Sequence, residues 1–271
     1  MGMLNDFPKT HGPKREKFIL NLLENSPERF SYDWQQIVTT ENGITAKFYV
    51  MSDALKVDGI RITVTADTQQ RIADRINCSL LTAKMCDLIW HYSKIRVTPK
   101  TLSNNSDTTK AMIKHSKMID TELQYVDSKG KLISTVGRDW VIDDYLELSP
   151  ILDPAVDYGW HFMGDDYKGL KGSKNVSGLK GLGGSEWRVI QDIGMAHNKN
   201  YTDYNHTCRL MSRECIVNGE VMDFHEVLKD QELAHLASHT GPLSIVRQPG
   251  VSMPGVVIFT PSLIDELKDK F

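Results

Sequence analysis

The sequence predicts an α+β fold in which a helix-rich N-terminal half packs on a β-rich C-terminal half. Apolar residues recur at helical spacing through much of residues 1–126. Short apolar runs bounded by turn residues dominate residues 127–271, as is typical of strands. Strands and helices do not alternate regularly, which argues against a doubly wound parallel sheet. We expect the two regions to form one compact unit, because 271 residues suffice for a single large core.

The first half is expected to contain four helices and two strands. The helices are predicted over 14–25, 68–77, 83–93 and 109–124, and the strands over 44–51 and 59–66. Side-chain oxygens at helix starts can accept hydrogen bonds from the free backbone N–H groups of the first turn. The expected N-caps are Asp67 or Thr68, Thr82, and Asp107 or Thr108.

The second half is expected to consist mainly of strands, over 131–136, 139–144, 157–163, 186–193, 208–217 and 251–260. Asn218-Gly219 indicates a tight hairpin turn, because both residues adopt positive φ easily. Two short helices are expected within 223–237 and a terminal helix in 261–271. The segment 164–184 is rich in glycine and lysine, and we interpret it as a flexible loop that could cover a site or contact a partner.

Composition and charge narrow the class of protein. The net charge of −3 and the isoelectric point near 6.3 give no excess of basic residues, so no nucleic-acid partner is expected. No apolar run approaches the ~20 residues of a membrane span, and the first residues lack the basic-then-apolar order of a signal peptide. The four cysteines form no CxxC pair, which is typical of a reducing compartment. We therefore expect a cytoplasmic or virion-associated protein with no membrane contact.

The polar segment 197–210 is the main candidate site, because its sequence HNKNYTDYNHTCRL combines two histidines, two tyrosines, an aspartate and a cysteine. If a strand begins near its end, Tyr204, His206 and Cys208 lie on one face. Side chains two apart on a strand are about 6.5–7 Å from each other, too far for a direct hydrogen bond between His206 and Cys208. The plain structural alternative is a strand start with Cys208 buried and His206 facing solvent.

A second imidazole from a neighbouring strand would complete a catalytic group. His161 or His197 could supply it, so that His206 or His197 would be the general base and Cys208 the nucleophile. Arg209 would lower the pKa of the thiol and hold an anion or a carboxylate of the substrate.

The same histidines could instead hold a metal ion. His161, His197 and His206, with Asp203 or Asp192, would give zinc its protein ligands and leave a position for water. A zinc-bound water attacks amide or ester carbonyls because its pKa falls toward about 7. The sequence contains no HExxH or HxH pattern, so the leading expectation is no cofactor, with zinc as the alternative.

Two resemblances bear on this segment. YNHTCRLM (204–211) resembles the SHGCxR signature of the L,D-transpeptidase (YkuD-like) family, whose histidines and cysteine carry acyl transfer on cell-wall peptides. YGWH (158–161) and 197–210 together resemble more closely a group of uncharacterised bacterial and phage proteins with YGWH followed by H…YADYSHG-IRLV. In that alignment Cys208 falls where the group has an aliphatic residue, and Thr207 replaces the glycine of both patterns. The resemblance therefore implies a site at 197–209 more strongly than it implies thiol chemistry.

These observations predict a hydrolase or acyl-transferase acting on amide bonds, with cell-wall peptides as the candidate substrate. The expected site residues are His161, His197, Tyr204, His206, Cys208 and Arg209. The alternative is a non-catalytic phage or virion-associated interaction protein. An enzyme should bring the three imidazoles together in a cleft. An interaction protein should instead show dispersed histidines and an exposed apolar patch.

Overall fold

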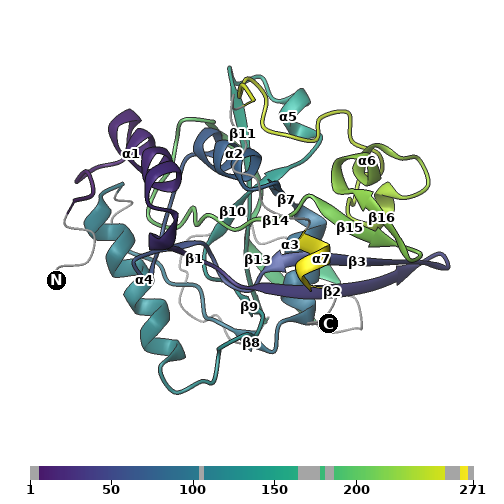
Figure 1. Cartoon of the computed structure of the whole chain (residues 1–271), viewed down its shortest axis with the longest axis horizontal. Coiled ribbons are helices and arrows are strands. Elements are labelled where there is room, and N and C mark those ends of the chain that lie inside the picture. Colours follow the sequence, from purple (N-terminus) through teal and green to yellow (C-terminus); the bar gives the residue numbers. More distant parts are fainter. Residues whose placement is uncertain (1–5, 104–106, 164–177, 181–185, 254–262, 268–271) are drawn as a thin grey trace.

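The architecture mixes helices and strands throughout the chain (Figure 1). The computed structural model describes residues 6–103, 107–163, 178–180, 186–253 and 263–267. The helices are α1 (Pro13–Asn25), η1 (Pro27–Arg29), α2 (Ala66–Arg75), α3 (Ala83–Tyr92), α4 (Thr109–Leu123), α5 (Tyr145–Leu148), α6 (Phe224–Lys229), η2 (Ala234–Leu236) and α7 (Leu263–Leu267).

The strands of the first half are β1 (Phe30–Ser31), β2 (Trp34–Glu41), β3 (Ile44–Met51), β4 (Lys56–Val57), β5 (Ile60–Arg61), β6 (Cys78–Ser79), β7 (Leu81–Thr82) and β8 (Ile95–Arg96). Those of the second half are β9 (Ile133–Ser134), β10 (Arg138–Ile142), β11 (Pro154–Met163), β12 (Gly178–Lys180), β13 (Glu186–Asn198), β14 (Met211–Ser212), β15 (Glu214–Val217) and β16 (Glu220–Asp223).

Two larger sheets join strands from both halves of the chain. One has the order β16-β15-β3-β14-β6, with β2 paired to β3, and the other has the order β12-β13-β11-β10-β7. Because β3, β6 and β7 belong to the first half, the predicted division into a helix-rich N-terminal half and a β-rich C-terminal half is wrong. The α+β mixture itself is present. The division failed because the described part of the first half contains eight strands of its own, and four of them, β3, β6, β7 and β8, pair with strands of the second half, which a sequence pattern does not show.

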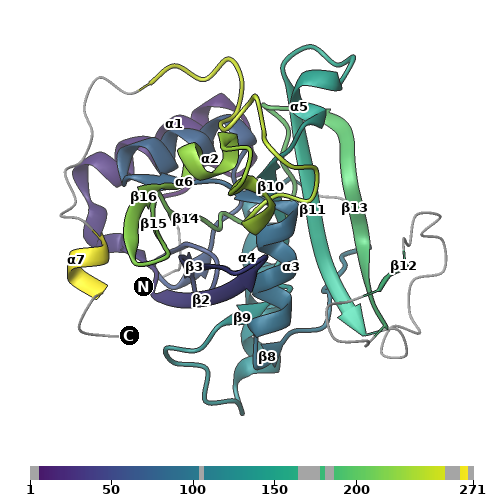
Figure 2. The ribbon, with the colours of Figure 1, turned by 90° about the vertical axis from the view of Figure 1, so that its right-hand side faces the viewer.

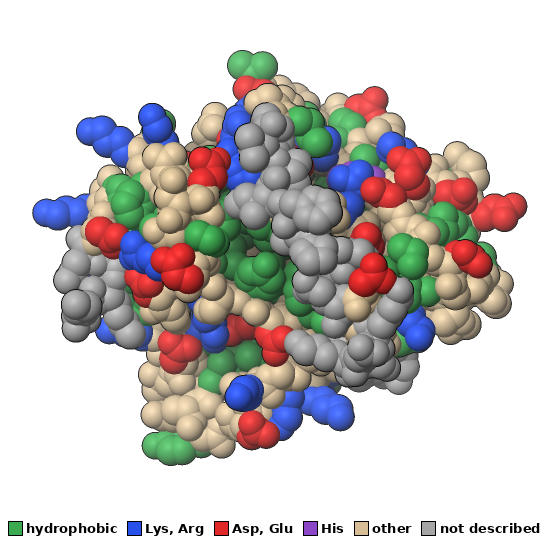
Figure 3. Space-filling model, viewed as in Figure 1, with side chains coloured by type: hydrophobic (Ala, Val, Ile, Leu, Met, Phe, Trp, Pro, Cys, Tyr) green, Lys and Arg blue, Asp and Glu red, His purple; other side chains and the backbone are tan. Residues whose placement is uncertain are grey.

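The largest apolar core also draws on both halves, running from Phe7 and Ile19 through Trp140 to Leu243 and Val246. Helices α1 and α2 lie together on one side of the molecule, and β11 and β13 form a long ribbon on another (Figure 2). On the face shown in Figure 3, basic and acidic side chains are interspersed. Among the described residues, no helix is both long enough and apolar enough to cross a membrane.

The residues at the helix starts predicted most of the N-caps correctly. Thr82 accepts a hydrogen bond from the N–H of Met85, and Thr108 accepts one from the N–H of Ala111, so both are N-caps as predicted. For α2 the expected caps were wrong, because the helix begins earlier and Thr65 accepts from the N–H of Thr68.

Several expected strands differ from the structure in length. The predicted strand 59–66 is reduced to the two residues of β5, and 208–217 is divided into β14 and β15. The glycine- and lysine-rich segment 164–184, apart from β12, lies outside the described residues, as does most of the expected last strand 251–260.

The pairing of β11 with β13 is irregular at the base of this ribbon, which we define as residues 155–159 of β11 and the residues opposite them. This irregularity determines where the side chains of the candidate site point. The register shifts between Ala155 and Asp157 and again between Asp157 and Gly159. Gly159 and Trp160 then adopt φ values of +133° and +60°. Positive φ is rare for a bulky residue such as tryptophan, so this bend is imposed by the surrounding structure.

Candidate functional site

Two of the three predicted imidazoles converge, and the third lies elsewhere. His197, at the end of β13, and His206, in the loop before β14, have ring centroids 5.8 Å apart with their planes at 83°. His161 is instead bound through Nε2 to the carboxylate of Asp87 on α3, at 2.7 Å. The candidate site is therefore built around His197 and His206.

His206 is completely buried and its ring is held from several sides. The indole of Trp140 on β10 stacks on it, with ring centroids 4.1 Å apart and planes at 7°. Its Nδ1 lies 3.1 Å from Oδ1 of Asp203 and 3.2 Å from the backbone nitrogen of the same residue. Its Nε2 lies 3.5 Å from Oδ2 of Asp157 but makes no hydrogen bond with the described residues.

Asp157 brings a completely buried carboxylate to the same place from the irregular part of β11. Its Oδ2 accepts a hydrogen bond from Nη1 of Arg138 at 2.7 Å, whereas its Oδ1 has no partner among the described residues. Burial opposes ionisation, but the neighbouring His206 and the charge of Arg138 outweigh it, so the pKa of Asp157 is lowered. A Cβ on Gly194 of β13 would lie 2.3 Å from Oδ1, so glycine is required at that position.

Arg138, the first residue of β10, ties the acidic side chains together. Its Nη1 also donates to Gln191 at 3.1 Å, its Nη2 to Asp203 at 3.1 Å, and its Nε to Asn205 at 2.7 Å. The pKa of Asp203 is strongly lowered, because the hydrogen bond and charge of His206 together with the charge of Arg138 outweigh the effect of burial. With every donor group engaged, Arg138 fixes the site rather than offering itself to a ligand.

His197 forms the more accessible side of the cluster. Its ring is half-buried and stacks on Tyr201, with centroids 3.9 Å apart and planes at 5°. Burial and the nearby charges of His206 and Arg138 lower its pKa. One donor atom each from Asp157, His197 and His206 lies within 4.8 Å of the others. Two imidazoles and one carboxylate are a ligand set used by catalytic zinc and by non-haem iron.

The remaining residues of the predicted site point to other partners. Cys208 is completely buried, and its backbone pairs with Ile62 and Leu55 at 3.1 and 2.7 Å. Burial raises the pKa of its thiol well above the usual value. The hydroxyl of Tyr204 accepts from the N–H of Leu102 at 3.0 Å, and Nη2 of the buried Arg209 donates to a backbone carbonyl at 2.6 Å.

A second polar cluster surrounds Asp87. This carboxylate accepts from Tyr158 at 2.8 Å and bonds to Nε2 of His161 at 2.7 Å and of His239 at 2.6 Å. Trp90 stacks on His161, with centroids 5.6 Å apart. Three partners satisfy Asp87, so this arrangement is explained by its own hydrogen bonds.

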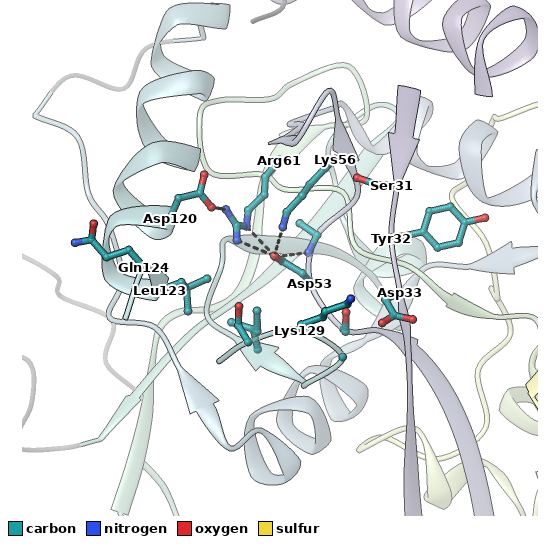
Figure 4. A pocket seen from close by; sticks show the side chains of 15 residues that line it. Ser31, Tyr32, Asp33, Asp53, Lys56, Arg61, Asp120, Leu123, Gln124 and Lys129 are labelled. Carbon is teal, nitrogen blue, oxygen red and sulfur yellow. Dashed lines mark hydrogen bonds and ion pairs between the residues drawn. The ribbon is translucent and has the colours of Figure 1, made fainter. Parts of the chain in front are cut away.

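A pocket of about 380 Å³ lies apart from both clusters (Figure 4). Its floor is an ion-pair network in which Asp53 bonds to Lys56 at 2.8 Å and to Arg61 at 2.7 Å. Arg61 also reaches Asp120 at 2.6 Å. These charges neutralise one another, so the pocket has no obvious preference for an ionic ligand.

Sequence reasoning missed Asp157 and Arg138 as members of the cluster. Asp157 stands directly before the YGWH motif, which is a positional hint, but no pattern distinguishes Arg138 from a surface arginine. The sequence suggests Asp203 only as a metal ligand. Comparisons with protein-family models, with curated proteins and with solved structures give no match for this chain.

Proposed function

We propose that the chain is a hydrolase that cleaves acyl bonds, amides in the first place, at the cluster of Asp157, His197 and His206. The observation that supports this proposal most is a pair of buried atoms, Oδ1 of Asp157 and Nε2 of His206, that lack hydrogen-bond partners among the described residues. Leaving such an atom unsatisfied costs about 1–3 kcal/mol, so a ligand that meets both would be bound favourably. Water is the simplest such ligand.

The proposed reaction needs only groups of this cluster and the substrate. A water held between the imidazoles and the carboxylate gives a proton to one of them as its oxygen attacks the substrate carbonyl. The C–O bond forms first, the C–N bond then breaks, and the departing amine takes up the proton. The products are a carboxylic acid and an amine. Asp203 and Arg138 act as positioning residues, since they hold His206 and Asp157 without facing the substrate.

Hydrolysis by water is preferred here over acyl transfer through a thiol. Burial raises the pKa of the Cys208 thiol well above its usual value, so the nucleophilic thiolate would be scarce. The amide class, with cell-wall peptides as its candidate members, comes from the resemblance of residues 204–211 to transpeptidases.

The second candidate function is a non-catalytic interaction protein. It is favoured by the separate position of His161 and by two exposed leucines on and after α5, Leu148 and Leu152, which are 70% and 87% exposed. In this alternative the histidine cluster would only organise the loop before β14.

A turnover assay distinguishes the two. The purified chain is incubated with acylated dipeptide amides and with soluble cell-wall peptides, and new amines are detected by a fluorogenic reagent and by mass spectrometry. We expect His197→Gln to lower the rate by at least about 100-fold. The control is His91→Gln, an exposed histidine on α3 outside the cluster. Absence of turnover on every substrate, or full activity of His197→Gln, would reject the hydrolase.

A further inference from the structure

We infer that Asp157, His197 and His206 bind one divalent transition-metal ion, with Zn²⁺ as the best fit. The inference concerns binding and does not depend on the proposed hydrolysis. It rests on the donor set, on two unsatisfied buried atoms, and on the residues behind the donors.

The distances fit a metal site if the three donor atoms move slightly closer together. Zinc binds imidazole nitrogen and carboxylate oxygen at about 2.0–2.2 Å, which places tetrahedral donors about 3.4 Å from one another. The three donor atoms lie within 4.8 Å of one another. Closing by roughly 1 Å lies within the reach of side-chain torsions, because each donor ends a rotatable side chain.

The unsatisfied atoms point to a ligand independently of the distances. Asp157 and His206 are both 0% exposed, yet Oδ1 of the first and Nε2 of the second make no hydrogen bond with the described residues. Nε2 also lies only 3.5 Å from the other carboxylate oxygen, Oδ2. A cation placed between this nitrogen and the carboxylate oxygen would be attracted by both.

The opposite edge of the His206 ring is held by Asp203. Nδ1 faces the carboxylate of Asp203 at 3.1 Å and the backbone N–H of the same residue at 3.2 Å. The backbone N–H of Asp203 donates to Nδ1, and the nearby carboxylate adds a charged contact that holds the ring in place. On the other edge of the ring, Nε2 faces Asp157. A carboxylate behind a ligating histidine is the usual second layer of a metal site, because it orients the ring and increases its basicity.

Charge and donor type indicate which ion fits. Two carboxylates, Asp157 and Asp203, face one arginine, Arg138, so the cluster has one negative charge in excess when both imidazoles are neutral. A divalent ion would reverse this to one positive charge, which a bound hydroxide or a substrate oxygen can neutralise. Imidazole ligands favour zinc or ferrous iron over calcium and magnesium, which prefer oxygen donors alone. Three protein ligands leave a coordination position open on the accessible side of His197.

The test measures metal binding without reference to activity. The full chain, without a histidine tag, is stripped with a chelator and titrated with Zn²⁺ by calorimetry, and with Co²⁺ while visible absorption is recorded. We expect one Zn²⁺ per chain, absorption bands of four- or five-coordinate Co²⁺, and a Zn²⁺-dependent rise in melting temperature. A parallel titration with Fe²⁺ identifies the preferred ion.

Variants assign the ligands. His197→Ala should lower the Zn²⁺ affinity by at least about 100-fold, and Asp203→Asn by about 10–100-fold. His197 is half-buried, so its removal should leave the circular dichroism spectrum unchanged even if Asp157→Asn does not fold. The matched control is His239→Gln, which removes another histidine bound to a carboxylate and should leave the affinity unchanged.

The outcomes of this binding test can be distinguished from those of the turnover assay. Stoichiometric binding without turnover would reject only the hydrolase. The metal site is rejected if the wild-type chain binds no equivalent of Zn²⁺ or Fe²⁺, or if His197→Ala binds as tightly as the wild type.

Discussion

The indole of Trp140 lies parallel to the imidazole of His206, with 4.1 Å between ring centroids and 7° between planes. The indole is fixed in turn, because its Nε1 donates to the carbonyl of Val64 at 2.9 Å. The orientation of the His206 imidazole is thus fixed by a buried tryptophan on strand β10. Such support is what keeps a donor within reach of its ligand.

Replacement of Trp140 should therefore affect both stability and the site. Trp140→Leu leaves a cavity in the core and should lower the free energy of unfolding by about 2–4 kcal/mol in urea titrations. Trp140→Phe keeps a ring against His206 and should cost less. If the two variants lose equal stability and retain unchanged Zn²⁺ affinity, the stacked ring has no role in positioning His206.

Gly194 should be intolerant of any side chain. A methyl group there would lie 2.3 Å from Oδ1 of Asp157 and 2.6 Å from Nε2 of Gln191. We expect Gly194→Ala to displace the carboxylate and to lower Zn²⁺ affinity and any turnover by at least about tenfold. Its φ is not in the positive region, so the backbone accepts alanine and the effect is steric. Unchanged affinity in a folded Gly194→Ala protein would contradict this placement of Asp157.

Acid should destabilise the fold through His115. This residue is 1% exposed, and burial together with the charge of Arg61 lowers its pKa to about 4. The unfolded chain takes up a proton near pH 6.5 and the folded chain only near pH 4. The contribution of the neutral ring is therefore complete above pH 6.5 and is lost as the pH falls toward 4, by roughly 3 kcal/mol.

Urea titrations at pH 7.5 and 4.5 measure this effect. His115→Phe should lose less stability between the two pH values than the wild type does. Some acid sensitivity should remain, because burial also lowers the pKa of His225, to about 3. An identical pH dependence in His115→Phe and the wild type would exclude His115 as its source.

The thiols should be unreactive in the folded protein. Cys78, Cys86, Cys208 and Cys215 are buried, and burial raises the pKa of each. A thiol reagent should therefore label the native chain slowly and the denatured chain at four positions. Cys208→Ala should retain turnover within about twofold while losing about 1–2 kcal/mol of stability. Loss of turnover in a folded Cys208→Ala protein would favour thiol chemistry instead.

Much of the local structure could be predicted from the sequence, but the pairing of strands that are distant in the chain could not. The strand 44–51 and the helix cap Thr82 were predicted correctly, since both depend on neighbouring residues. Strand β2 was missed although Asn42-Gly43, both with positive φ, form the turn that joins it to β3. This dipeptide is the strongest short-range hairpin signal and should have identified the strand.

Only part of the candidate site could be predicted from the sequence, because strand β11 is irregular. In a regular strand Asp157 and His161 would share one face, because side chains alternate with period two. The register shifts and the positive φ of Trp160 break this alternation. Asp157 consequently faces His206 while His161 faces Asp87. No composition or spacing in the sequence indicates the bend, so the carboxylate of the cluster could not be foreseen.

The two ends of the β11–β13 ribbon differ in what they contribute to the candidate site. Its base, where Ala155 pairs with His197, carries the donor atoms, and its outer part runs on to Met163 opposite Trp187. The described part of the ribbon beyond Gly159 contributes none of the three donor side chains. If the proposed site is right, the outer part of the ribbon could vary in sequence without displacing the three donor side chains at its base.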